Sequence, residues 1–274
     1  MNRPLVVEAL ALALVGCVAP PVATVPSATA QGSPAASSTS AAKQCSWPGG
    51  ARAAVSLTYD DAMASQLRYA VPVLERHGLK ATFFLSGKNL AEFSALAKAG
   101  HELGSHTVTH PCNADLASLS LDDMAAELDA SISDLHGLGT TGKLTFAYPC
   151  GQTRLARSES YIPLVQQRYR AARGVAAAVA EPASVDLFSV PALFPPTSSD
   201  GSDLLAFVDR AVSTGGWAVI GMHGVSELGE YLQLAQPAHD KLLAYLAEHA
   251  SRIYTAPFGT VADVVAACQS AAGK

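Results

Sequence analysis

The sequence carries little charge and no concentration of positive charge. Only 15% of its 274 residues are charged, the formal net charge is −5, and no basic run is interleaved with aromatic residues. Proteins that bind nucleic acid need clustered Lys or Arg to neutralise phosphates. The composition therefore argues against nucleic acid as a partner, while a hydrophobic content of 49% is enough for a sizeable core.

Two common motifs are also missing. No glycine-rich loop follows an expected strand, which argues against a nucleotide site. No G-x-S-x-G segment marks a serine nucleophile on a strand-to-helix turn. The chain is therefore not expected to bind a nucleotide or to use a serine nucleophile of that kind.

The N-terminus predicts export. A short basic start precedes an apolar run at 5–16, which has the length of a signal peptide and is too short to span a bilayer. The run ends in Leu14-Val15-Gly16-Cys17, which resembles the lipobox of bacterial lipoproteins. We predict a signal peptide at 1–17 and a lipid on Cys17, which would be the only contact with a membrane. Secretion after cleavage behind Ala30 is the alternative, so the protein belongs at the bacterial cell envelope or outside the cell.

Residues 18–43 are rich in Ala, Pro, Ser and Thr, have no periodicity, and predict a flexible linker before a folded domain at 44–274. Four cysteines lie in that domain, and an even number in an exported chain indicates two disulfides, for which three pairings are possible. Cys45 and Cys268 flank the domain, so we pair them, which leaves Cys112 with Cys150.

Strand-like and helix-like segments alternate through the domain. The expected strands are 53–58, 81–85, 102–105, 144–148, 170–175, 187–190, 217–222 and 252–256, and the expected helices are 64–77, 90–99, 121–135, 158–168, 203–213, 237–248 and 261–269. Such alternation predicts an α/β fold with a parallel sheet, because parallel neighbours need crossover helices. We expect a single deformed (β/α) barrel of about seven strands, with an open doubly wound sheet as the alternative.

Polar residues collect where three expected strands end. Asp60 and Asp61 follow the first strand, His106 and His110 the third, and His223 the seventh. In a barrel these ends share one rim. Two histidines four residues apart, with one carboxylate, leave open positions on Zn²⁺ or a similar ion for water and substrate. The sequence therefore predicts a divalent metal, zinc first, with cobalt, nickel or manganese as possible replacements.

Four segments together resemble, in order, motifs of the polysaccharide deacetylase family with a NodB-like domain. They are Thr58-Tyr59-Asp60-Asp61, His106-Thr107-Val108-Thr109-His110, Phe146-Ala147-Tyr148-Pro149-Cys150-Gly151 and 219–223. The resemblance implies that Asp60 is the general base, that Asp61, His106 and His110 hold the metal, and that His223 is the general acid. It also implies that Tyr148 and Pro149 line the groove and that the Cys150 N–H helps to hold the oxyanion.

This chain departs from the family pattern in three places. Many relatives carry an Arg that pairs with the base, where Ala147 stands here, and Arg173 is the candidate substitute. The motif D-x-x-D-W, which orients the acid histidine, has no clear match, and Asp186 is the candidate stand-in. Gly221 stands where a Leu commonly forms the methyl pocket. The acetyl pocket is therefore expected to differ in shape from that of the family.

The expected function is a metal-dependent hydrolase that removes acetyl groups from an N- or O-acetylated glycan by metal-activated water. A Cys112–Cys150 disulfide would pin the loops on both sides of the metal. One alternative is a hydrolase of non-glycan amides on the same scaffold, and another is a catalytically silent glycan-binding module. The presence of both Asp60 and His223 argues against the silent module, because a binder needs neither a proton acceptor nor a donor.

Overall fold

The computed structural model describes residues 45–87, 90–155, 159–229 and 232–273. The predicted signal peptide, its lipidation site Cys17 and the linker at 18–43 lie outside the described residues, so these bounds stay predictions. No helix in the described part of the chain combines the length and apolar character needed to cross a membrane.

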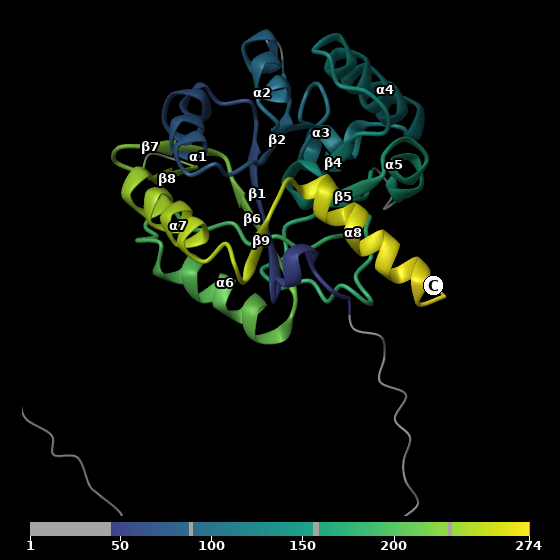
Figure 1. The fold of residues 1–274 in the computed structure, drawn as a ribbon. Helices are drawn as coiled ribbons and strands as arrows, with labels where there is room; N and C mark the ends of the chain where they lie inside the picture. Colours follow the sequence, from purple (N-terminus) through teal and green to yellow (C-terminus); the bar gives the residue numbers. More distant parts are fainter. Residues whose placement is uncertain (1–44, 88–89, 156–158, 230–231, 274) are drawn as a thin grey trace, which may run out of the picture. The chain divides into compact units, whose positions relative to one another are not determined.

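A curled, parallel seven-stranded sheet forms the centre of the domain (Figure 1), which confirms the expected α/β class. Its order is β5-β4-β3-β2-β1-β6, and β9 also pairs with β1. The strands are β1 Ala53–Asp60, β2 Thr82–Leu85, β3 Glu102–Ser105, β4 Thr145–Ala147, β5 Ala171–Arg173, β6 Trp217–Met222 and β9 Ile253–Thr255. A separate pair, β7 Gly224–Ser226 and β8 Gln233–Ala235, follows β6.

The expected strand at 187–190 is wrong. Val190 makes only an isolated parallel bridge to Arg173 of β5, and a few residues later Leu193 bridges Ile220 of β6. Pro191 lies between these bridges, and a proline has no N–H to continue a ladder. An irregular segment therefore joins the two outer strands and completes the barrel-like curl.

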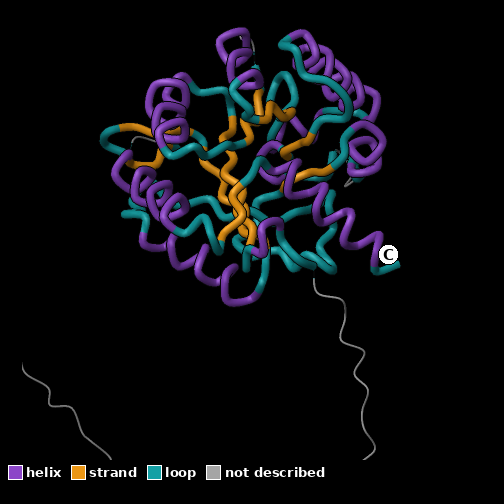
Figure 2. Tube along the Cα trace, in the orientation of Figure 1, coloured by secondary structure: helices purple, strands orange, loops and turns teal. Residues whose placement is uncertain are grey.

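Helices surround the strands (Figure 2). They are η1 Pro48–Gly50, η2 Gln66–Ala70, α1 Val71–Arg76, η3 Leu90–Phe93, α2 Ser94–Lys98, α3 Asn113–Ser118, α4 Leu121–Gly137, η4 Pro149–Gly151, α5 Ile162–Arg168, α6 Ser202–Thr214, α7 Gln236–Glu248 and α8 Phe258–Ala271. The longest of them, α4, begins with a capping box in which Ser120 and Asp123 satisfy each other's backbone N–H. The helix expected at 64–77 is divided into a π-helical turn, η2, and the α-helix α1.

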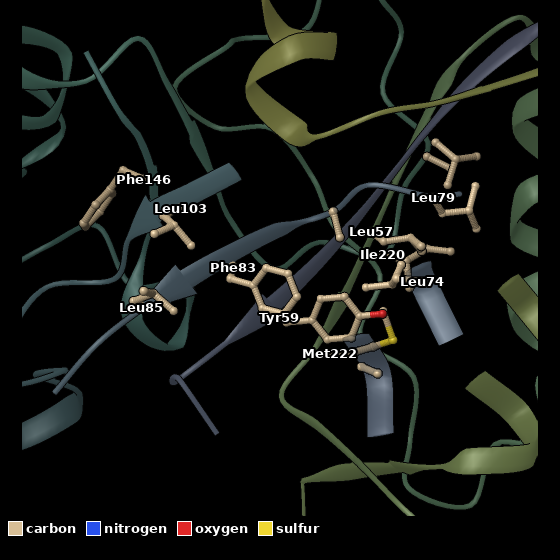
Figure 3. Packing of buried hydrophobic residues seen from close by; sticks show 14 of the residues in the cluster. Leu57, Tyr59, Leu74, Leu79, Phe83, Leu85, Leu103, Phe146, Ile220 and Met222 are labelled. Carbon is tan, nitrogen blue, oxygen red and sulfur yellow. The ribbon is translucent and has the colours of Figure 1, made fainter. Parts of the chain in front are cut away.

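Alternate residues of β1 face different layers. Leu57 and Tyr59 pack in the layer between sheet and helices (Figure 3), whereas Ala54 belongs to a second cluster with Trp217 and Phe258. All eight residues of β1 are buried, as expected for a central parallel strand covered on both faces. Because side chains alternate, Asp60 shares the face of Ala54.

Both predicted disulfides are present. Cys45 and Cys268, with Cα atoms 5.6 Å apart, join the two ends of the domain. Cys112 and Cys150, with Cα atoms 6.0 Å apart, join the loop after β3 to the loop after β4.

Candidate metal centre and active site

Asp61, His106 and His110 bring one ligand atom each to a common point. The Nε2 atoms of the two histidines are 3.1 Å apart. Asp61 Oδ1 lies 3.4 Å from His110 Nε2 and 3.6 Å from His106 Nε2. Ligands at ordinary Zn–N and Zn–O bond lengths in a tetrahedron are about 3.4 Å from one another, so this donor set fits a zinc-sized ion.

The hydrogen bonding of these side chains also suits a cation. His106 Nδ1 is 2.8 Å from the Ala147 carbonyl and must donate to it, which leaves the lone pair of Nε2 facing the cluster. Burial lowers the pKa of His106, which favours the neutral imidazole that a metal needs. Asp61 Oδ1 is buried and has no hydrogen-bond partner among the described residues. A bound cation would satisfy that oxygen.

The loop that carries the two histidines is held in an uncommon backbone conformation. Thr107 and His110 have φ values of 63° and 52°, in the left-handed region that non-glycine residues rarely adopt. The Thr107 hydroxyl accepts a hydrogen bond from His110 N (3.0 Å). Glu127 on α4 accepts bonds from Val108 N and Thr109 N, each 3.0 Å. These bonds offset the backbone strain. Glu127 was not among the residues that the sequence predicted for the site.

Asp60 is paired with Arg173, the residue that the sequence singled out. Arg173 Nη2 donates to both carboxylate oxygens of Asp60, at 2.7 and 2.5 Å, and both side chains are buried. The guanidinium lies between the rings of Phe84 and Phe194, 5.1 and 5.0 Å from their centroids. An arginine from β5 thus stands beside the carboxylate that ends β1.

His223 reaches the same cluster from the end of β6. Its Nε2 is 3.9 Å from Asp61 Oδ2, and its ring packs against Phe194, with centroids 5.3 Å apart. Asp186, the candidate stand-in, is not among the described residues that line the cavity beside His223. Asp186 is exposed, and its carboxylate accepts a hydrogen bond from Phe188 N (2.8 Å), which closes a local turn.

Gln66 joins the base and acid segments, and sequence reasoning missed it. Its Nε2 donates to the Asp60 carbonyl (2.5 Å) and to the His223 carbonyl. The sequence carries one signal for Gln66. It lies in line with Ala70 and Val73 on the buried side of this segment, where an apolar side chain is expected instead of an amide.

A cavity of about 500 Å³ opens over the cluster. It is lined by Asp60, Asp61, His106, His110, Tyr148, Cys150, Val175, Ala177, Ala192, Phe194, His223 and Leu232. Cys150 has a φ of 52°, and its neighbour Pro149 is buried. The Tyr148 hydroxyl donates to the Phe188 carbonyl (3.0 Å), so Tyr148 contributes mainly its ring to the wall.

Phe194 explains the glycine at position 221. A β-carbon on Gly221 would overlap the Phe194 ring, so only glycine lets this ring lie against the end of β6. Phe194 thereby fills space beside His223 that a larger residue at 221 would occupy. The aromatic side chain comes from the irregular segment 191–196, which pattern reasoning did not connect with β6.

The comparisons with known proteins place this fold and site in a family. A family model described as polysaccharide deacetylase matches residues 49–162, which include both aspartates and both clustered histidines. A chitin deacetylase of Colletotrichum lindemuthianum is 34% identical over 94 residues, 31% of this chain and 35% of that protein. A peptidoglycan-N-acetylglucosamine deacetylase of Bacillus cereus is 37% identical over 79 residues, 26% and 27% of the two chains. The chain thus spans about a third of these curated relatives or less.

Solved structures agree on the fold. A Mycobacterium smegmatis protein assigned to the polysaccharide deacetylases superposes with a TM-score of 0.58 at 18% identity, over 81% of this chain and 93% of that one. A CE4 family pseudoenzyme from Bacillus anthracis superposes with a TM-score of 0.50 at 20% identity, over 81% and 67% of the two chains. Residues 49–162, which carry the three candidate metal ligands, belong to the polysaccharide deacetylase family.

Proposed function

We propose that this protein is a metal-dependent hydrolase that removes acetyl groups from an N- or O-acetylated glycan. The observation that carries the proposal is the convergence of Asp61, His106 and His110 within 3.1–3.6 Å of one another. Asp60 and His223, a proton acceptor and a proton donor, flank that point. A cavity of about 500 Å³ provides room for substrate.

A divalent ion held by the three ligands would polarise the acetyl carbonyl and lower the pKa of a bound water. Asp60 then accepts the proton of the attacking water, and its pairing with Arg173 keeps the carboxylate in place. The Cys150 N–H donates to the oxyanion that forms when water adds to the acetyl carbonyl carbon. His223 gives a proton to the departing amine or alcohol, so that each proton has a named donor and acceptor.

The apolar walls of the cavity favour a second candidate, a hydrolase of a compact non-glycan amide. Besides Tyr148 and the two aspartates and three histidines of the site, the cavity is lined by Cys150, Val175, Ala177, Ala192, Phe194 and Leu232. Sugar hydroxyls need polar partners when they are buried, and this wall offers few.

Acetate release separates these candidates. Purified protein, stripped with a chelator and reloaded with Zn²⁺, Co²⁺, Ni²⁺ or Mn²⁺, is assayed on chitin oligomers, peptidoglycan fragments, acetylated xylan and small aryl acetamides. Turnover of glycans that returns only with metal supports the proposal. Turnover of aryl acetamides alone favours the second candidate, and none on any substrate means a silent module. Asp60→Asn should abolish turnover and keep the metal.

Export is part of the proposal. Two disulfides are stable in an oxidising compartment, which supports a location outside the cytosol. Metabolic labelling with a fatty acid tests the lipid on Cys17, with Cys17→Ser as the control. A labelled wild type and an unlabelled variant support the anchor, whereas an unlabelled wild type favours secretion.

A further inference from the structure

The side chain of Gln66 lies between the two segments that carry the proposed base and acid. Gln66 is the first residue of the π-helical turn η2, and its side chain is fully buried. A primary amide nitrogen has two N–H donors, and here one points to the Asp60 carbonyl (2.5 Å) and the other to the His223 carbonyl. One side chain therefore fixes the backbone of both residues.

These carbonyls lie where the parallel ladder ends. β1 and β6 are paired up to Tyr59 and Met222, which are the residues immediately before Asp60 and His223. Beyond that pair β1 and β6 are no longer paired with each other, and the amide of Gln66 supplies the next connection between the two segments. The distance between base and acid across the proposed site thus depends on this amide.

Two neighbouring features allow the Gln66 amide to reach these carbonyls. A β-carbon on Gly224, the residue after His223, would overlap the Ser65 hydroxyl, so a glycine at 224 lets the start of η2 pack against β7. A π-helical turn has hydrogen bonds that span one residue more than those of an α-helix, and such turns are frequent at functional sites. Both features serve the approach of Gln66 to the end of β6.

Burial of this amide is not explained by stability alone. Its Oε1 has no hydrogen-bond partner among the described residues, and an unsatisfied buried oxygen is costly. The gain from the two donated bonds is of the same order as that cost, so the amide adds little net stability. The residue is better accounted for by what it positions.

We infer that Gln66 is a positioning residue that sets the separation of Asp60 and His223 for proton transfer. The inference rests on the proposed function, because it assigns the two residues their roles. It predicts that loss of the amide slows the chemical step and leaves metal and substrate binding nearly unchanged.

The test compares Gln66→Met with a matched control. Gln269 on α8 also donates from Nε2 to two backbone carbonyls, those of Pro182 and Val185, at 2.9 Å each. Gln269→Met removes two bonds of the same kind far along the chain from Asp60 and His223. Turnover, KM, zinc stoichiometry and melting temperature are measured for the wild type and both variants, with Gln66→Asn as a shorter amide should Gln66→Met not fold.

We expect Gln66→Met to lower kcat by about 30-fold or more, with KM within about threefold and one zinc retained. Gln269→Met should keep the kcat of the wild type, and Gln66→Asn should fall between. Equal kcat in folded, zinc-loaded Gln66→Met and wild type overturns the inference, as does an equal loss in both Gln→Met variants. A wild type that releases no acetate from any substrate overturns the proposed function itself.

Discussion

Arg173 and Asp60 form a buried ion pair that joins β5 to β1, in which one guanidinium nitrogen donates to both carboxylate oxygens. Asp60 is 3% exposed, and Arg173 is fully buried. Removing one partner of a buried ion pair leaves the other charge uncompensated, which typically costs about 3–5 kcal/mol. We therefore expect Arg173→Met to lower the free energy of unfolding by about 3 kcal/mol and to abolish turnover. Urea denaturation measures the first and acetate release the second.

The double variant Asp60→Asn/Arg173→Met is the control for that prediction. It removes both charges, so it should be more stable than Arg173→Met alone, though equally inactive. A loss below about 1 kcal/mol in Arg173→Met, the value of an exposed pair, would contradict the burial argument.

Metal binding should stabilise the fold independently of any activity. A ligand that binds only the folded state at a concentration 100 times its dissociation constant adds about 2.7 kcal/mol. We expect Zn²⁺ to raise the melting temperature of the stripped wild type and to leave Asp61→Ala nearly unchanged. Asp115→Ala on α3 is the matched control and should respond like the wild type. An equal shift in Asp61→Ala would mean that zinc binds elsewhere.

The sequence predicted those parts of the fold and site that depend on periodicity and on short motifs. β1, β2, β3 and β6 are near-continuous runs of buried residues, so their bounds were found within about two residues. Asp61, His106 and His110 follow such strands directly. Their convergence follows from the rule that parallel strand ends share a rim, and the structure brings them together.

Contacts made by irregular segments could not be predicted. Phe194 reaches Gly221 from a segment interrupted by prolines. Arg173 lies on the regular strand β5, 113 residues from Asp60, and was named only through the family resemblance. No local pattern encodes such pairs, because they depend on how the curled sheet brings its two outer strands together. Asp186, by contrast, makes a local contact, because its carboxylate accepts a hydrogen bond from Phe188 N.

The two disulfides should have different effects. The chain-entropy model gives about 5 kcal/mol for the 223-residue separation of Cys45–Cys268 and about 4 kcal/mol for the 38 residues of Cys112–Cys150. Only the second touches the site, because Cys150 lines the cavity and Cys112 Sγ lies 3.7 Å from His110 Nδ1. Replacing Cys112 and Cys150 by Ala should therefore lower kcat, measured below the melting temperature.

The matching Cys45→Ala/Cys268→Ala variant should lose stability and keep the kcat of the wild type while folded. The two double variants thus separate stability from catalysis. Wild-type turnover in folded Cys112→Ala/Cys150→Ala would show that the loops need no covalent link.

Substitutions at Phe194 and Gly221 should have coupled effects on turnover. Leu at 221 would overlap the ring of Phe194, which also packs on Arg173 and His223, and overpacking costs about 1–3 kcal/mol. We expect Gly221→Leu to lose most of its turnover, because the displaced ring disturbs both neighbours. Gly221→Leu/Phe194→Ala should recover part of it, as measured by kcat. A double variant no better than the single one would show that the backbone at 221, not the ring, is the sensitive feature.

Acid should weaken the fold through His239. This histidine is fully buried on α7, where its Nε2 lies 2.7 Å from the Tyr59 hydroxyl and its Nδ1 3.4 Å from Asp240 Oδ1. Burial lowers its pKa, although Asp240 acts in the opposite direction. Because the folded pKa is below the value of 6.5 for a free histidine, the unfolded chain takes up a proton that the folded chain refuses. Stability is therefore complete above about pH 6.5 and decreases as the pH falls.

The expected slope is up to about 1.4 kcal/mol per pH unit for one such histidine. His239→Gln should make the unfolding free energy less dependent on pH between 5.5 and 7.5, even if the variant is less stable overall. His136 is exposed on α4, so solvent reaches it in both states and His136→Gln is the matched control. Urea melts at several pH values measure both slopes. An unchanged slope in His239→Gln would mean that His239 takes up a proton in the folded protein despite its burial.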